Sequence, residues 1–101
     1  MGHNVSTANF LLESRIRDAA AGKSDALYDL GVAYSSGSGG VSLDLVEAHK
    51  WFNLAALNGD MRGQTCRAEI ADEMSAREIA EAQRAARAWL AGTLPPQRLA
   101  A

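Results

Sequence analysis

Apolar side chains recur along the chain at the three- and four-residue spacing of amphipathic helices, and this pattern predicts five helical segments. No convincing stretch shows the alternation of apolar and polar residues that marks a half-buried strand. The predicted helices cover about residues 7–21, 25–35, 44–58, 60–73 and 75–90.

Short polar residues at the starts of these segments are predicted helix caps. Ser24 is a predicted N-cap of the second segment, because its hydroxyl can accept a hydrogen bond from a free amide of the first turn. Asp44 and Glu47 at the third segment resemble a capping box, with Asp in place of Ser or Thr. Ser75 and Glu78 form a capping box that gives the fifth segment the clearest start in the chain.

The composition also favours an all-α fold in a single domain. Apolar residues make up 48% of the 101 residues, and 20 of them are Ala, whereas Val, Ile and Thr together number only 10. Ala suits close-packed helices, and β-branched residues suit sheets. We predict one domain over residues 1–92, followed by a loose tail over 93–101 that starts near Pro95 and Pro96.

The charge balance argues against two classes of partner. Lys and Arg number 10 and Asp and Glu number 12, so the net charge is −2, whereas a general binder of nucleic acid or anionic membrane carries a basic excess. No apolar run approaches the roughly 20 residues that span a bilayer, and no secretory signal is visible. We therefore expect a soluble, cytoplasmic protein that binds neither nucleic acid nor membrane.

The candidate chemical groups are few, and their spacing argues against a catalytic or metal site. His3 and His49 do not share the spacing of a helical metal pair, and we expect His49 to be exposed. The lone cysteine, Cys66, excludes a disulfide framework and is expected to be a buried, inert thiol. Arg62 and Arg67 lie near it in sequence, so a lowered thiol pKa is the alternative. We predict no catalytic residue, no cofactor and no metal.

Two helix pairs share one pattern with a period of 37 residues, counted from Gly22 to Gly59. The first pair carries Leu30–Gly31 on its first helix and Trp51–Phe52 on its second. In these residues the chain resembles the SEL-one-like repeats, which are relatives of tetratricopeptide repeats. The resemblance implies a short α/α solenoid of antiparallel helix-turn-helix units. The implied solenoid comprises one strong repeat over 22–59, a degenerate second repeat over 60–91 and a half-repeat cap over 7–21.

The second unit departs from this pattern at the position of Leu30. The 37-residue offset places Arg67 there, and an arginine that points at a core needs a carboxylate or carbonyl partner. Either Arg67 bridges helices at the end of the solenoid, which we favour, or the register of the fourth segment is off by one. Trp89–Leu90 stands where Trp51–Phe52 stood in the first unit.

The first helix of each unit lines the concave surface of tetratricopeptide-like solenoids, so the resemblance implies a ligand-binding groove there. At 100° per residue, the residues of the second segment that lie opposite Leu30 form one face of that helix. Adding the 37-residue offset to their numbers gives the equivalent residues of the fourth segment. The predicted partner-binding residues are Asp25, Tyr28, Val32, Ser35, Arg62, Thr65, Glu69, Asp72 and Glu73. Tyr28 and Val32 form an apolar patch beside an acidic end, which suits a basic peptide. The alternative is an ordinary solvated face.

These observations predict a non-catalytic protein- or peptide-binding module that acts as an adaptor, a regulator or an immunity-type partner. One alternative is a hydrolase-like enzyme for cell-wall-type substrates, although the family members with that proposed activity are rich in cysteine. The other is a structural piece that self-associates through Phe10 or Trp89. We expect a monomer or a weak homodimer.

Overall fold

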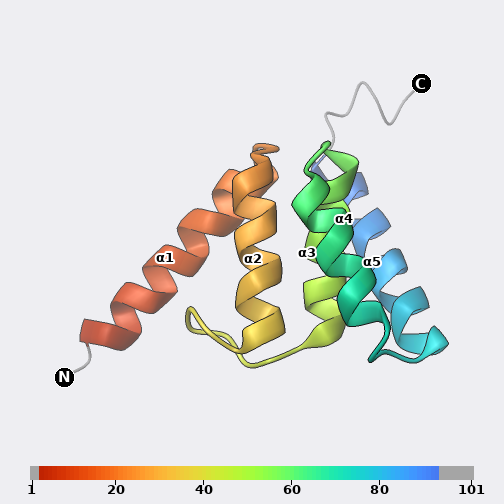
Figure 1. The fold of residues 1–101 in the computed structure, drawn as a ribbon. Coiled ribbons are helices and arrows are strands. Elements are labelled where there is room, and N and C mark those ends of the chain that lie inside the picture. Colours follow the sequence, from red (N-terminus) through yellow and green to blue (C-terminus); the bar gives the residue numbers. More distant parts are fainter. Residues whose placement is uncertain (1–2, 94–101) are drawn as a thin grey trace.

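The computed structural model describes residues 3–93, and these residues form five successive helices and no strand (Figure 1). The helices are α1 (His3–Ala20), α2 (Ser24–Ser36), α3 (Leu45–Leu57), α4 (Met61–Ala71) and α5 (Ala76–Thr93). Every predicted segment is helical, so the all-α prediction is confirmed. α5 continues past its predicted end at Leu90 and includes Thr93, the first residue of the predicted tail. The rest of that tail, residues 94–101, lies outside the described residues.

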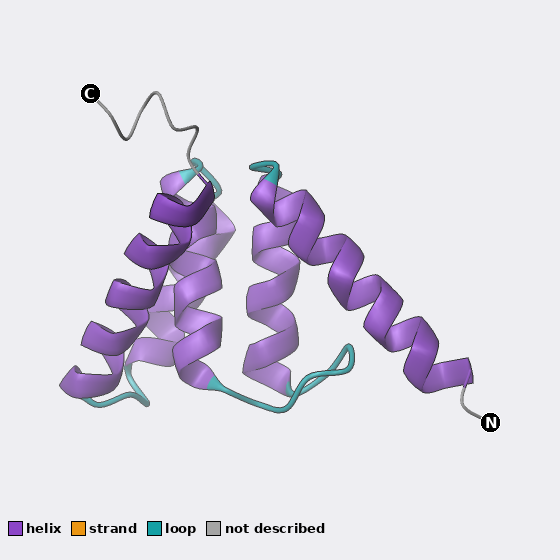
Figure 2. Ribbon diagram, turned by 180° about the vertical axis from the view of Figure 1, so that it is seen from behind, coloured by secondary structure: helices purple, strands orange, loops and turns teal. Residues whose placement is uncertain are grey.

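α3 is the central element of the packing. It packs against α2, α4 and α5, whereas α1 packs against α2. α1 lies at one end of the row of helices and α5 at the other, and α1 diverges from α2 toward its N-terminus (Figures 1 and 2). The buried cluster between the helices consists of Ala19, Ala26, Leu27, Leu30, Trp51, Leu54, Ala55 and Ala86.

Two glycines allow α3 to approach its neighbours closely. A Cβ on Gly31 of α2 would overlap the ring of Phe52, which is one of the largest fully buried side chains. A Cβ on Gly63 of α4 would lie 2.6 Å from the backbone oxygen of Phe52 and 2.9 Å from Cβ of Ala55. Glycine at these positions therefore sets the spacing of α2 and α4 from the central helix.

The predicted caps of α3 and α5 are present. Asp44 is the N-cap of α3, and its carboxylate accepts a hydrogen bond from the amide of Glu47 at 3.1 Å. At α5, the Ser75 hydroxyl accepts from the Glu78 amide at 3.1 Å, and the Glu78 carboxylate accepts from the Ser75 amide at 2.8 Å. Both halves of the capping box are formed at α5, which confirms the predicted start of this helix.

The predicted cap of α2 is wrong by one residue. Lys23 is the N-cap and Ser24 is the first helical residue, and no side chain caps this helix. The carbonyl of Lys23 already accepts hydrogen bonds from the amides of Ala26 and Leu27, at 3.1 and 3.2 Å. Because the backbone closes the first turn from Lys23, the Ser24 hydroxyl is one position too late to act as the cap.

The loops that follow α1 and α3 meet at one end of the molecule. Gly22 and Gly59 both have positive φ, at 84° and 90°, a conformation that favours glycine. The side-chain amide of Asn58 donates a hydrogen bond of 2.8 Å to the carbonyl of Gly22. The two equivalent turns are thereby tied together across the repeat.

The second unit differs from the first in how its helices are spaced. The first helices of the units start 37 residues apart, at Ser24 and Met61, but the second helices start only 31 apart, at Leu45 and Ala76. In this register, Ala82 and Gln83 take the places of Trp51 and Phe52. The predicted equivalence of Trp89–Leu90 with that pair is therefore wrong. Trp89 instead packs edge-on against the Trp51 ring, with 4.7 Å between ring centroids.

Arg67 connects α4 to α3. Its guanidinium donates a short hydrogen bond to the side-chain oxygen of Asn53. The favoured interpretation, in which Arg67 bridges helices, is confirmed, and the arginine needs no carboxylate partner because an amide oxygen accepts its hydrogen bond.

His49 is buried, so the prediction that it is exposed is wrong. Only 3% of the residue is accessible, because α3 is covered by neighbouring helices on three sides. Its Nδ1 has no hydrogen-bond partner. Burial, and secondarily the charge of Arg67, lower the pKa of His49 below its usual value. Cys66 is half-buried rather than fully buried.

Candidate partner-binding face

α2 and α4, the first helices of the two units, lie side by side and contact each other directly (Figure 1). They start 37 residues apart, at Ser24 and Met61, which is the offset used to assign the candidate residues of α4. Residues 37 apart on the two helices therefore occupy equivalent positions. We refer to the surface formed by these two helices as the α2–α4 face.

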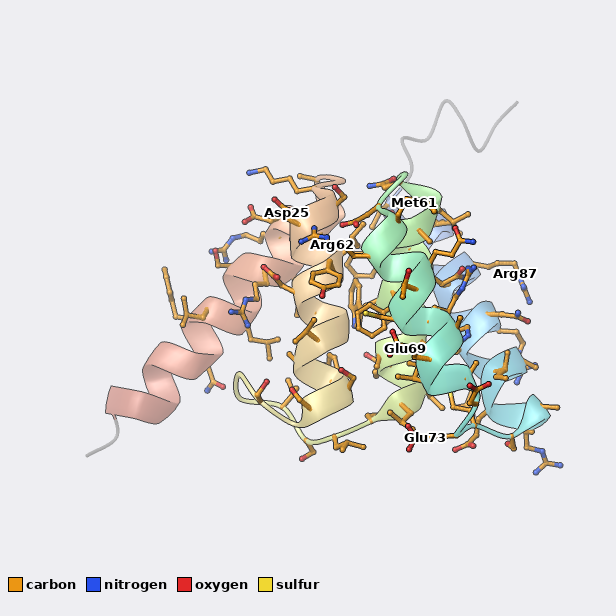
Figure 3. All side chains as sticks on the ribbon, in the orientation of Figure 1. Asp25, Met61, Arg62, Glu69, Glu73 and Arg87 are labelled. Atoms are coloured by element: carbon orange, nitrogen blue, oxygen red, sulfur yellow. The ribbon has the colours of Figure 1, made fainter. Side chains whose placement is uncertain are left out.

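Arg62 links the two helices at one end of this face (Figure 3). Its Nη2 donates to Asp25 on α2 at 2.8 Å and to Asp60 at 2.7 Å. Asp60 is also the N-cap of α4 and accepts a hydrogen bond from the Arg62 amide at 3.0 Å. These hydrogen bonds from Arg62 lower the pKa of Asp60, and the two carboxylates raise the pKa of Arg62. The positive charge of Arg62 is thus offset locally by two carboxylates.

The ring of Tyr28 lies between Phe52 and Arg62. The Tyr28 and Phe52 centroids are 5.8 Å apart, and the guanidinium carbon of Arg62 lies 4.2 Å from the Tyr28 centroid, a cation–π distance. The neighbouring Cys66 and partial burial raise the pKa of Tyr28, and Arg62 opposes them. Tyr28 is half-buried, in agreement with the prediction that its ring is partly accessible, but it also packs against the core.

A pocket of about 340 Å³ opens beside this ring. Met61, the first residue of α4, is 67% exposed and contributes an apolar wall. The pocket is lined by Tyr28, Met61, Arg62, Thr65 and Cys66. Its lining combines an aromatic ring, a thioether and a thiol with one guanidinium, so it can accept an apolar side chain next to a polar rim.

Four of the nine predicted binding residues meet at this pocket or next to it. Tyr28, Arg62 and Thr65 line it, and Asp25 is bonded to Arg62. The Thr65 hydroxyl donates to the carbonyl of Met61 at 3.2 Å and does not reach across to α2. Val32 lies one turn beyond Tyr28 on α2 and is 37% exposed.

The remaining predicted residues are not part of the pocket. Figure 3 shows Glu69 and Glu73 progressively farther from Arg62 along α4 and the turn after it. Glu69, Asp72 and Glu73 are exposed, and no Lys or Arg of the described residues lies within ion-pair distance of them. On α2, the Ser35 hydroxyl donates to the carbonyl of Val32 at 3.0 Å.

Met61 and Cys66 were missed by the sequence interpretation, although the sequence contains a signal for both. Met61 precedes Thr65 by four residues and Cys66 follows Arg62 by four, so each shares a helix face with a predicted residue. Selecting only the strict equivalents of α2 positions excluded them.

Two further kinds of site are not found in the part of the chain that the structure describes. Residues 9–93, whose side chains the structure describes, contain no cluster of three or more His, Cys, Asp and Glu that could hold a metal ion. None of the described helices has the length and apolarity required to cross a membrane.

Comparison with known proteins identifies one part of the chain. Residues 24–60 match the Sel1 repeat, and this match spans α2, α3 and the turn that leads into α4. No curated protein and no solved structure gives a significant match. Sel1 repeats generally mediate protein–protein interactions and are usually non-catalytic, and no enzyme family matches. The chain therefore contains a Sel1 repeat, formed by residues 24–60.

Proposed function

We propose that the α2–α4 face binds a protein or peptide segment, so that the chain acts as a non-catalytic adaptor or regulator. The observation that carries the proposal is the pocket between Tyr28 and Met61, which lies where two successive units meet. The Tyr28 ring is held in place by Phe52 and Arg62, so little conformational entropy is lost when a ligand covers it.

The charges along the face favour a basic ligand. Arg62 is offset by Asp25 and Asp60, whereas the carboxylates at the other end of α4 have no basic neighbour at ion-pair distance in the described chain. Asp72 follows the last helical residue of α4, where the helix dipole already makes the potential negative. We therefore propose that an apolar side chain of the ligand enters the pocket while a Lys or Arg lies toward Glu69, Asp72 and Glu73.

The test separates the pocket from the rest of the surface. The immobilised chain is used to capture partners from a cell extract, and the purified partner is then titrated calorimetrically. Met61→Asp places a charge in the pocket without disturbing the core, because Met61 is 67% exposed and an acidic residue is favourable in the first turn of a helix. We expect this change to weaken binding by about 1 kcal/mol or more.

Two further variants complete the experiment. Glu69→Lys should weaken the binding of a basic partner, mainly by slowing its association. Leu43→Asp is the matched control, because Leu43 is 61% exposed but lies in the loop before α3. If the partner bound the wild-type protein and the Met61→Asp and Glu69→Lys variants with equal affinity, the binding site would lie elsewhere and the proposal would be refuted.

A further inference from the structure

The two ends of the helical row present different surfaces to solvent. α5 exposes a charged outer surface that includes Arg77, Glu81, Arg84 and Arg87. Such a polar outer face is typical of the terminal, capping element of a helical repeat. On α1, in contrast, Phe10 is 62% exposed and Leu11 is 48% exposed. The outer surface of α5 is therefore mostly charged, with Leu90 36% exposed, and the α1 end retains more apolar surface.

Most of the exposed residues of α1 form one stripe, and Leu11 lies outside it. Leu12, Ile16 and Ala19 pack toward the core, and the opposite side of the helix is exposed. At 100° per residue, Phe10, Glu13, Arg17 and Ala20 follow one exposed side of α1, and Ala21 continues it in the turn after the helix. We call these five residues the α1 stripe. α1 diverges from α2 toward its N-terminus, so this part of the helix is separated from its neighbours (Figures 1 and 2). At the other end of the stripe, Ala20 and Ala21 border a pocket that residues of α3 and α5 also line.

The α1 stripe is complementary to itself when one copy is turned around. In an antiparallel pair of identical helices, opposing residues have numbers with a constant sum. With a sum of 30, Glu13 of one copy opposes Arg17 of the other, and the two-fold axis repeats this pair. In the same register, the large Phe10 opposes the small Ala20, again twice. One register thus satisfies both charge and size.

The charges of the stripe are also available for such a contact. Neither Glu13 nor Arg17 takes part in an ion pair within the described chain. We propose that two copies of this chain associate through an antiparallel α1–α1 contact with two-fold symmetry. From residue 9 to residue 21 the contact is about 18 Å long at 1.5 Å per residue. Because this is a small interface, we expect a weak dimer that forms in a concentration-dependent manner.

The α1 stripe does not use residues of the α2–α4 face. A dimer formed through α1 therefore leaves both copies of that face free. A ligand with two binding segments could engage both, which raises its apparent affinity without any new contact.

Sedimentation velocity of the full chain, across a wide concentration range, tests this proposal. A reductant is present throughout, so that a disulfide between Cys66 residues of two copies cannot produce a dimer. We expect the wild-type protein to shift from monomer to dimer as its concentration rises. Phe10→Ala should raise the dissociation constant about tenfold or more, because it removes the large apolar side chain of the contact.

The charge pair gives a sharper test, because a charge swap can restore what each single change removes. Glu13→Arg or Arg17→Glu places like charges opposite each other and should also weaken the dimer about tenfold. The double variant Glu13→Arg/Arg17→Glu restores both pairs and should return the dissociation constant to within about threefold of the wild-type value.

The matched control carries the same swap at the other end of the row. Arg77→Glu/Glu81→Arg exchanges charges with the same four-residue spacing on α5 and should leave the dimer unchanged. The proposal is overturned if the wild-type protein stays monomeric at every concentration. It is also overturned if a dimer forms but does not respond to Phe10→Ala, or if the α5 swap weakens it as much as the single α1 changes. Circular dichroism confirms that each variant is folded.

Discussion

Gly63 is a position where one added methyl group should disturb the fold, because it would meet backbone atoms of the neighbouring helix. Replacement of an interior helical glycine by alanine normally stabilises a helix by about 0.8–1.0 kcal/mol. At Gly63, however, the added Cβ would lie 2.6 Å from the Phe52 carbonyl oxygen and 3.0 Å from the Ala56 amide nitrogen. Both atoms belong to the backbone of α3, so neither can move aside by changing a rotamer. The only relief is for α4 to move away from α3.

The size of the effect follows from these two opposing terms. Overpacking of this kind costs typically about 1–3 kcal/mol. Because both close neighbours are backbone atoms, the upper half of this range applies, about 2–3 kcal/mol. After the gain in helix propensity is subtracted, we expect Gly63→Ala to destabilise the protein by about 1–2 kcal/mol. For a domain of this size, that corresponds to a decrease in the melting temperature of roughly 4–16 °C. Arg62 flanks Gly63 on α4, so the same movement should displace it from Asp25 and Tyr28.

Thermal and urea unfolding, followed by circular dichroism, measure this effect against a control within the same chain. Gly92 lies in α5, and a Cβ there would meet nothing within 4 Å. Gly92→Ala should therefore leave the protein unchanged or stabilise it slightly, because the propensity term acts alone. If Gly63→Ala were as stable as Gly92→Ala, the close approach of α4 to α3 would not exist and the geometry of the α2–α4 face would be wrong.

Two further predictions concern the cap of α5 and the buried histidine. Ser75→Ala removes the acceptor for the Glu78 amide and should reduce stability by about 0.5–2 kcal/mol in urea unfolding. Ser42 is an exposed serine in the loop before α3, and an unchanged midpoint, equal to that of the Ser42→Ala control, would contradict the prediction. Because burial and Arg67 lower the pKa of His49 in the folded state, the unfolded chain binds the proton more tightly. The contribution of neutral His49 to the free energy of unfolding should therefore be fully present above the unfolded pKa of about 6.5 and decrease as the pH falls below it. His49→Gln should abolish this decrease between pH 6.5 and 5. An identical pH profile for wild-type and His49→Gln proteins would refute this assignment.

The helices and the repeat could be predicted because both depend on local spacing. Apolar periodicity and the capping box of Ser75 are properties of short sequence windows, and both survive in the structure. The error at His49 has a different origin. A helical pattern separates a buried from an exposed side only for a helix with a solvent-facing side, and α3 is contacted by α2, α4 and α5. The sequence does not reveal how many neighbours a helix will have.

The candidate site was predicted in part for a similar reason. The 37-residue offset matches the starts of α2 and α4, and it correctly brings Arg62 opposite Asp25 and next to Tyr28. The offset assigns each residue to a face of its helix, but it does not take the length of the side chain into account. The long side chain of Met61 extends into the pocket from the first residue of α4. A side chain with several rotatable bonds contributes to surfaces that its backbone angle alone does not indicate.

The two helices of the α2–α4 face are held by different kinds of contact, and this bears on how the face can work. α2 buries five residues against the rest of the chain, whereas the only buried residue of α4 is Gly63. Polar contacts also hold α4, through the Arg67 hydrogen bond to Asn53 and the exposed Arg62–Asp25 ion pair. Exposed ion pairs contribute little to stability, so α4 is the more easily displaced of the two helices. A ligand that spans both helices therefore adds contacts to the one with fewer buried residues, and its binding energy stabilises the position of α4.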